Sequence, residues 1–294
     1  MTVAQSPMMA SAPVPATRQR LAQRYPWLYP WAVHVHQARR HVAWLTAPAR
    51  GTRWARDREA EALPFRVKKH GSLLLRQLDG AQMELQHNKV TNLRLASART
   101  DGLLLRPGET FSFNRVVGSC TRRKGYVEGM RLSNGTALAG VGGGICQLAN
   151  LLHWMFLHSP LTIVERSEHS FDPFPDHERV LPWGVGCSIV YNYVDLVVRN
   201  DTATTFQLRT CVGERHLKGE LRADGAMTHS YSVEARAEEF LRAPAGQVYR
   251  RNEIWRQVFS RQTGELLAEE CMKRNCALVK YEPDPAKVRE WRPA

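Results

Sequence analysis

The chain has 294 residues, which is enough for one large domain or two smaller ones with a sizeable core. Its hydrophobic fraction of 43% and charged fraction of 23% are in the ordinary range of globular proteins. The formal net charge of +13 favours polyanionic partners: nucleic acid, anionic lipid headgroups or the wall polymers of a bacterial envelope. Because the arginines are dispersed, a solvated basic face is favoured over a nucleic-acid groove.

The six cysteines include no C-x2-C pair and no Cys/His cluster with zinc-finger spacing. A chain of this length does not need disulfides, so mostly reduced and buried thiols are expected. No stretch reaches the roughly 18 apolar residues of a membrane span, and the N-terminus lacks the pattern of a secretory signal. We therefore predict a cytoplasmic location, with peripheral membrane contact as an alternative. No metal or organic cofactor is expected.

The N-terminal part divides into two segments. Residues 1–16 are rich in Ala, Pro, Ser and Met and are expected to be disordered. Residues 17–60 form a basic, aromatic segment in which apolar residues recur at helical intervals over 18–45, followed by a linker-like stretch. The helical part is predicted to dock on its own domain or, less favoured, to lie on a membrane surface.

A core domain over residues 61–225 and a strand-rich extension over residues 226–294 follow. Ahead of a turn-rich stretch at 118–138, the pattern predicts a strand, a helix and a strand, at residues 65–78, 88–100 and 102–118. A long apolar helix is predicted over 144–158, and beyond it the hydrophobic period changes to two. This order indicates an α+β fold with N-terminal helices, a central helix packed on a mainly antiparallel sheet, and a strand-rich C-terminal tail.

The stretch "GVGGGICQ" places Cys146 between three glycines and the predicted apolar helix. In the first turn of that helix, unpaired backbone N–H groups and the positive end of the helix dipole lower a thiol's pKa toward neutrality. Gly142, Gly143 and Gly144 let the backbone approach a substrate closely, and their N–H groups are candidates for stabilising an oxyanion. The pattern thus makes Cys146 a candidate nucleophile.

Such a nucleophile needs a base and a group that orients the base. His169, at the end of the next predicted strand, is the candidate base, an arrangement similar to papain-like and NlpC/P60-like enzymes. The candidates for the third group are Asp195, Asn200, Glu165 and Glu168. The competing interpretation is structural, because a cysteine in a first turn usually packs and glycine runs usually form tight turns. His153 and His158, inside the helix, are expected to be packing or capping residues.

Three segments resemble the VanW family: "PGETFSFNRVVG", "GGGICQLANLLHWMFLHSPLTIVERSEH" and "YVDLVVRNDT". The hallmark of that family is a P-G-E-x-F-S-F strand followed by G-G-G-[ILV]-C-Q and a helix. The resemblance covers about residues 17–281. It implies an association with glycopeptide (vancomycin) resistance and peptidoglycan metabolism, and cysteine-dependent, L,D-transpeptidase-like acyl transfer on peptidoglycan stem peptides.

The resemblance also implies roles for individual residues. Cys146 would attack the donor peptide carbonyl, and His169 would shuttle the proton. Many family members carry an aspartate just before the Y-x-D-L segment where this chain has Gly186, so Asp195 would have to orient the histidine instead.

Gln147 and Glu109, the polar residues of the two motifs, are included as substrate-binding candidates. Two functions without catalysis remain open beside the enzyme. One is an accessory protein that binds a cell-wall peptide or precursor, and the other is a membrane-surface interaction protein.

Overall fold

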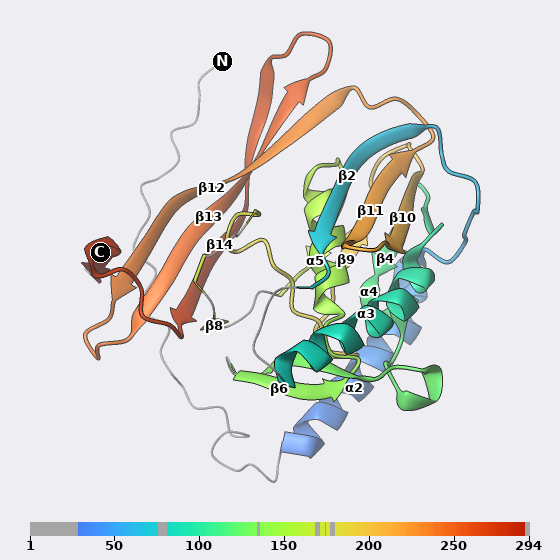
Figure 1. The fold of residues 1–294 in the computed structure, drawn as a ribbon. Coiled ribbons are helices and arrows are strands. Elements are labelled where there is room, and N and C mark those ends of the chain that lie inside the picture. Colours follow the sequence, from blue (N-terminus) through green and yellow to red (C-terminus); the bar gives the residue numbers. More distant parts are fainter. Residues whose placement is uncertain are drawn as a thin grey trace.

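The computed structural model describes residues 29–75, 81–133, 136–167, 171–173, 175–176 and 180–291. Its helices and strands form the predicted α+β fold (Figure 1). The described helices are α2 (Tyr29–Thr46), α3 (Ala81–Thr100), α4 (Phe113–Val117) and α5 (Cys146–Leu157), with short 3-10 turns at Pro48–Arg50, Arg122–Lys124 and Pro285–Lys287. The disorder expected for residues 1–16 lies outside the described residues.

Two four-stranded sheets belong to the core. The first sheet has the order β1 (Arg53–Trp54), β4 (Glu109–Ser112), β9 (Val197–Arg199), β7 (Thr162–Glu165). The second sheet has the order β2 (Phe65–Leu73), β11 (His216–Ala223), β10 (Phe206–Val212), β3 (Leu104–Leu105), and all its neighbours are antiparallel. A separate hairpin joins β5 (Glu128–Ser133) to β6 (Thr136–Val141).

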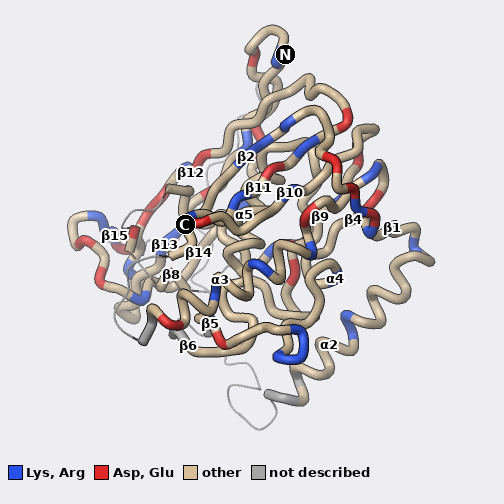
Figure 2. Tube along the Cα trace, turned by 45° about the vertical axis from the view of Figure 1, so that its right-hand side comes forward, with Lys and Arg blue, Asp and Glu red and all other residues tan. Residues whose placement is uncertain are grey.

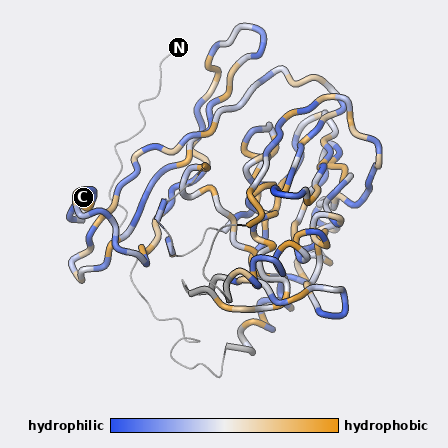
Figure 3. The backbone as a smooth tube through the Cα atoms, in the orientation of Figure 1, coloured by the Kyte–Doolittle hydropathy of each residue, from blue (hydrophilic) through white to orange (hydrophobic). Residues whose placement is uncertain are grey.

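A third sheet forms the strand-rich C-terminal part, as predicted. Its order is β15 (Val288–Glu290), β12 (His229–Arg242), β13 (Val248–Ser260), β14 (Leu266–Val279), β8 (Phe171–Asp172). The long strands β12, β13 and β14 are antiparallel and extend away from the core (Figure 1). Figure 3 shows runs of hydrophilic and of hydrophobic residues along them, and most residues of β12 and β14 are partly or fully exposed.

The main hydrophobic core surrounds α5 and includes residues of α3 and of both four-stranded sheets. Leu148, Leu152 and Met155 of α5 are fully buried there. On the facing strand β11, a Cβ atom at Gly219 would lie 2.8 Å from both the Leu151 and Met155 side chains, so the glycine permits the close helix–sheet approach. Burial of each such aliphatic side chain contributes roughly 1.5–3 kcal/mol. The apolar run after Cys146 therefore fixes α5 on the sheet.

Some elements differ from the prediction. The stretch predicted as turn-rich overlaps the β5–β6 hairpin, whose pairing places Gly129 opposite Gly140; glycine is depleted in strands and weakens the strand signal at these positions. α3 begins at Ala81, seven residues earlier than expected. The linker-like segment contains β1, which pairs in parallel with β4. None of the helices in the described ranges has the length and apolar character needed to cross a membrane.

Candidate functional site

Cys146 is the first residue of α5, so the prediction that its thiol lies in the first turn is confirmed. Its side chain packs against the main core, and its Sγ lies 3.9 Å from the Ile189 carbonyl oxygen. Burial raises the pKa of the Cys146 thiol, although backbone groups and the charge of Arg131 act in the opposite direction. The predicted lowering of this pKa is wrong, because the desolvation of the sulfur exceeds the stabilisation at the helix terminus.

Two backbone N–H groups of the glycine turn before α5 donate hydrogen bonds to nearby carbonyls. The Gly142 N–H donates to the Val127 carbonyl at 3.0 Å, and the Gly143 N–H donates to the Gly140 carbonyl at 2.9 Å. Two of the three N–H groups that were candidates for stabilising an oxyanion therefore have backbone acceptors, and a role for the Gly144 N–H stays a prediction. This geometry favours the structural interpretation of these two glycines.

Close packing explains why the run consists of glycine. A Cβ atom at Gly143 would lie 2.1 Å from the Gly129 carbonyl oxygen, and one at Gly144 would lie 2.1 Å from the Lys89 Cγ. The Gly143 carbonyl accepts a hydrogen bond of 2.9 Å from Asn92 Nδ2 on α3. The turn is thus pressed between α3 and the β5–β6 hairpin.

The two motif residues expected to bind substrate make structural hydrogen bonds. Gln147 Nε2 donates to Ser72 Oγ at 2.8 Å and to the Leu73 carbonyl at 2.7 Å, which ties the first turn of α5 to the end of β2. The Glu109 carboxylate accepts from the Arg106 N–H at 2.8 Å and closes the turn that precedes β4. A substrate-binding role for either residue stays a prediction.

Asp195 is fully buried at the corner between β4 and α4. Its Oδ1 accepts hydrogen bonds from the N–H groups of Asn114 (2.9 Å) and Leu196 (2.8 Å), and its Oδ2 accepts from Ser112 Oγ at 2.5 Å. Burial raises the pKa of Asp195 to about 6, against the effect of these hydrogen bonds. The carboxylate therefore holds a backbone corner. His169, the residue it was expected to orient, lies outside the described residues.

The other candidates for the orienting group also have partners. Glu165 forms a two-pronged ion pair with Arg40 of α2, with N–O distances of 2.6 Å. Asn200 Nδ2 donates to the carbonyls of Leu105 (2.8 Å) and Thr204 (2.7 Å). Glu168 lies outside the described part of the chain. The third member of a Cys/His site therefore stays open.

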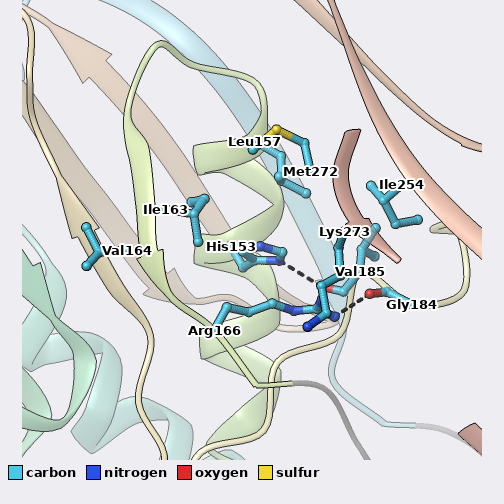
Figure 4. Close-up of a pocket in the computed structure, with 10 residues that line it drawn as sticks. All are labelled: His153, Leu157, Ile163, Val164, Arg166, Gly184, Val185, Ile254, Met272 and Lys273. Atoms are coloured by element: carbon cyan, nitrogen blue, oxygen red, sulfur yellow. Dashed lines mark hydrogen bonds between the residues drawn. The ribbon is translucent and has the colours of Figure 1, made fainter. Parts of the chain in front are cut away.

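A cavity of about 190 Å³ opens near the other end of α5, where α5, β7 and the third sheet meet (Figure 4). It is lined by His153, Leu157, Ile163, Val164, Arg166, Gly184, Val185, Ile254, Met272 and Lys273. None of these ten residues, all in the described ranges, is acidic. The cavity therefore combines an apolar wall with three basic side chains.

Two of the basic side chains of the cavity, Arg166 and His153, are held by backbone carbonyls. The Arg166 guanidinium donates to the carbonyls of Gly184 and Gly186, the latter at 2.5 and 3.0 Å. The His153 Nδ1 donates to the Val185 carbonyl at 2.8 Å. Burial lowers the pKa of His153 to about 3, with a smaller contribution from Arg166, so the imidazole is neutral at neutral pH. The ring thus carries its proton on Nδ1 and leaves Nε2 as an acceptor.

His153 is buried, as expected for a packing residue, whereas the cavity beside it was not predicted. Arg166 and Lys273 come from segments far apart in the chain, and no local pattern relates them. Within the described residues, no group of three or more His, Cys, Asp or Glu side chains could hold a metal ion.

Comparison with known proteins identifies the relatives of the chain. A family model described as "VanW like protein" matches residues 88–222. The Vancomycin B-type resistance protein VanW of Enterococcus faecalis is 33% identical over 275 residues, which are 93% of this chain and 98% of that protein. The Uncharacterized protein YoaR of Bacillus subtilis is 38% identical over 96 residues, 32% of each chain. No solved structure matches. The chain belongs to the VanW family, as its three motif segments predict.

Proposed function

We propose that this protein acts in glycopeptide resistance as an accessory protein that binds a cell-wall peptide or its precursor without turning it over. The printed name of its Enterococcus relative supports the association with vancomycin resistance. The observation that carries the binding function is the cavity between α5 and the third sheet, which joins an apolar wall to the cations of Arg166 and Lys273.

The chemistry of this cavity fits the end of a short peptide. Its volume of about 190 Å³ is below the roughly 300–1,000 Å³ of sites that enclose a whole small molecule. A terminal carboxylate would be attracted to Arg166 and Lys273, and small apolar side chains would contact Val185, Ile254 and Met272. A peptidoglycan stem peptide, with its free carboxyl end and small residues, has these properties.

The second candidate function is cysteine-dependent acyl transfer. The position of Cys146 in the first turn of α5 favours it, since this is where a nucleophile gains from backbone N–H groups. The raised pKa of the thiol weighs against it, because the thiolate is the reacting species. The binding function is therefore preferred.

Calorimetric titration with a carboxylate-terminated stem peptide tests the binding function. We expect Lys273→Glu to weaken binding at least about tenfold, since it places a negative charge beside the peptide carboxylate. The wild-type protein should bind an amide-terminated peptide with a similarly reduced affinity. Lys218→Glu, which changes an exposed lysine on β11, serves as the matched control and should bind normally. Equal affinities for the two variants, or no binding by the wild type, would overturn the proposal.

A further inference from the structure

One face of α2 exposes a row of large apolar side chains to solvent. Trp31, Val35, Val42 and Leu45 are 71%, 48%, 57% and 80% exposed. At about 100° per residue they lie within an arc of about 80°. They extend over 14 positions, or about 21 Å at 1.5 Å per residue. A contiguous apolar stripe of this kind is typical of a helix that contacts another apolar phase.

The opposite face of α2 is docked on the core through polar and aromatic contacts. Arg40 forms its ion pair with Glu165 at 2.6 Å, and the Gln37 carbonyl accepts from Asn192 Nδ2 at 3.0 Å. The ring of His36 lies against the ring of Tyr193, with centroids 4.8 Å apart. These contacts confirm the prediction that the helix docks on its own domain. They also fix the apolar stripe outward, which is the reverse of the usual arrangement in a soluble helix.

The charges around the stripe have one sign. The first 56 residues contain eight arginines and no aspartate, glutamate or lysine. On and after α2, exposed basic side chains are contributed by Arg39, Arg50, Arg53 and Arg56. Figure 2 shows α2 along the outer edge of the molecule with blue positions and no red ones. An anionic surface would meet matching charge along this whole edge.

We propose that α2 is a docking surface for an anionic lipid bilayer, on which the helix lies parallel to the membrane plane. Trp31, Val35, Val42 and Leu45 enter the boundary between headgroups and acyl chains, and the exposed arginines contact lipid phosphates. A second copy of the chain fits this face less well. Pairing two such helices would bring arginines together with no acidic side chain on either segment to neutralise them.

Co-sedimentation of the full-length protein with vesicles tests this proposal. We expect binding to phosphatidylglycerol-containing vesicles and none to pure phosphatidylcholine. Raising the salt from about 0.1 M to about 1 M should release the protein, because the Debye length falls from about 10 Å to about 3 Å. Binding to both vesicle types alike, or to neither, would overturn the proposal.

Matched variants separate the stripe from the general positive charge. Val42→Gln/Leu45→Gln removes two exposed apolar side chains while glutamine retains good helix propensity, so the fold is preserved. We expect it to lower vesicle binding at least about tenfold. The control is Leu266→Gln/Leu267→Gln, at positions 48% and 52% exposed on β14, which should bind as the wild type does. Circular dichroism checks the fold of the double variant. If it is not folded, the single variant Leu45→Gln is used in its place.

A second pair of variants tests whether the arginines beside the stripe contribute to vesicle binding. Arg39→Gln should weaken vesicle binding, whereas Arg123→Gln, at an exposed arginine in the turn at 122–124, should not. Equal loss in both arginine variants would show delocalised charge alone and contradict docking through α2. A concentration-dependent dimer that Val42→Gln/Leu45→Gln dissolves would show that a second copy covers the stripe, and would also overturn the proposal.

Discussion

Replacing Arg250 by methionine removes the cation from a buried ionic cluster in β13. The Arg250 side chain is 2% exposed, and its guanidinium contacts the Asp172 carboxylate at 3.1 Å and that of Glu238 at 2.7 Å. It also pairs with Asp176. The Asp172 side chain is equally buried and accepts a hydrogen bond from Tyr281 Oη at 2.9 Å. Methionine keeps much of the side-chain volume, so the substitution chiefly removes charge.

The expected loss of stability follows from what the substitution leaves behind. Breaking a buried ion pair by removing one partner costs about 3–5 kcal/mol, because the remaining carboxylate of Asp172 stays desolvated. The Arg250 guanidinium carbon also lies 4.9 Å from the centroid of the Trp183 ring and 5.1 Å from that of the Phe240 ring, and removing the cation weakens both contacts. Since Trp183 precedes Gly184 of the cavity, we expect weaker peptide binding as well.

Urea unfolding of Arg250→Met and Arg251→Met measures this difference. Arg251 is the next residue of β13 and forms an ion pair with Glu239 at 2.6 Å. The two side chains are 21% and 25% exposed, respectively. A partly exposed pair of this kind contributes about 0–1 kcal/mol. Equal losses in the two variants, or a loss below about 1 kcal/mol in Arg250→Met, would refute the role given to the buried cluster.

Three further substitutions or reactions test other parts of the structure. Burial raises the pKa of Asp195 from 3.8 to about 6, so its contribution to stability is present below about pH 4 and is lost as the pH rises through 6. Between pH 4 and pH 7, the free energy of unfolding in urea should therefore fall by roughly 2–3 kcal/mol less in Asp195→Asn than in the wild type. Identical pH profiles of the two proteins would contradict this. Gly143→Ala should lower stability by about 1–3 kcal/mol, because its Cβ meets the facing backbone, whereas Gly225→Ala, in open space, should leave the melting temperature unchanged. Iodoacetamide should label the exposed Cys211 at least about tenfold faster than Cys146, as mapped by peptide mass spectrometry, because Cys146 is only partly exposed and desolvation raises the pKa of its thiol; faster labelling of Cys146 than of Cys211 would contradict the raised pKa.

Local patterns were sufficient for the elements that bury one continuous face. The glycine run followed by apolar residues predicted that α5 begins near Cys146. The period of two predicted β10 and β11, because alternating residues face opposite sides of a sheet. Strand-like runs on either side of Thr263-Gly264 predicted the β13–β14 hairpin. The β5–β6 hairpin was missed because its facing glycines, Gly129 and Gly140, carry no hydrophobic signal.

The properties of the site depended on contacts between distant segments. The raised pKa of Cys146 results from the core packed around its sulfur, which helix position alone does not reveal. The cavity requires α5, β7 and β14 to meet, and places Arg166 near Lys273 only in the folded chain. The neighbours of Cys146 along the chain predicted a reactive thiol, whereas the burial of its sulfur is set by neighbours in space.

Peptide binding without covalent chemistry is tested most directly by adding a carboxylate-terminated stem peptide to the wild-type protein and to Cys146→Ala. Calorimetry gives the two affinities, and intact-protein mass spectrometry detects any acyl-enzyme. We expect the same Kd for both proteins and no increase in mass. A mass increase on Cys146 of the wild type that is absent from Cys146→Ala would show acyl transfer and contradict the accessory function.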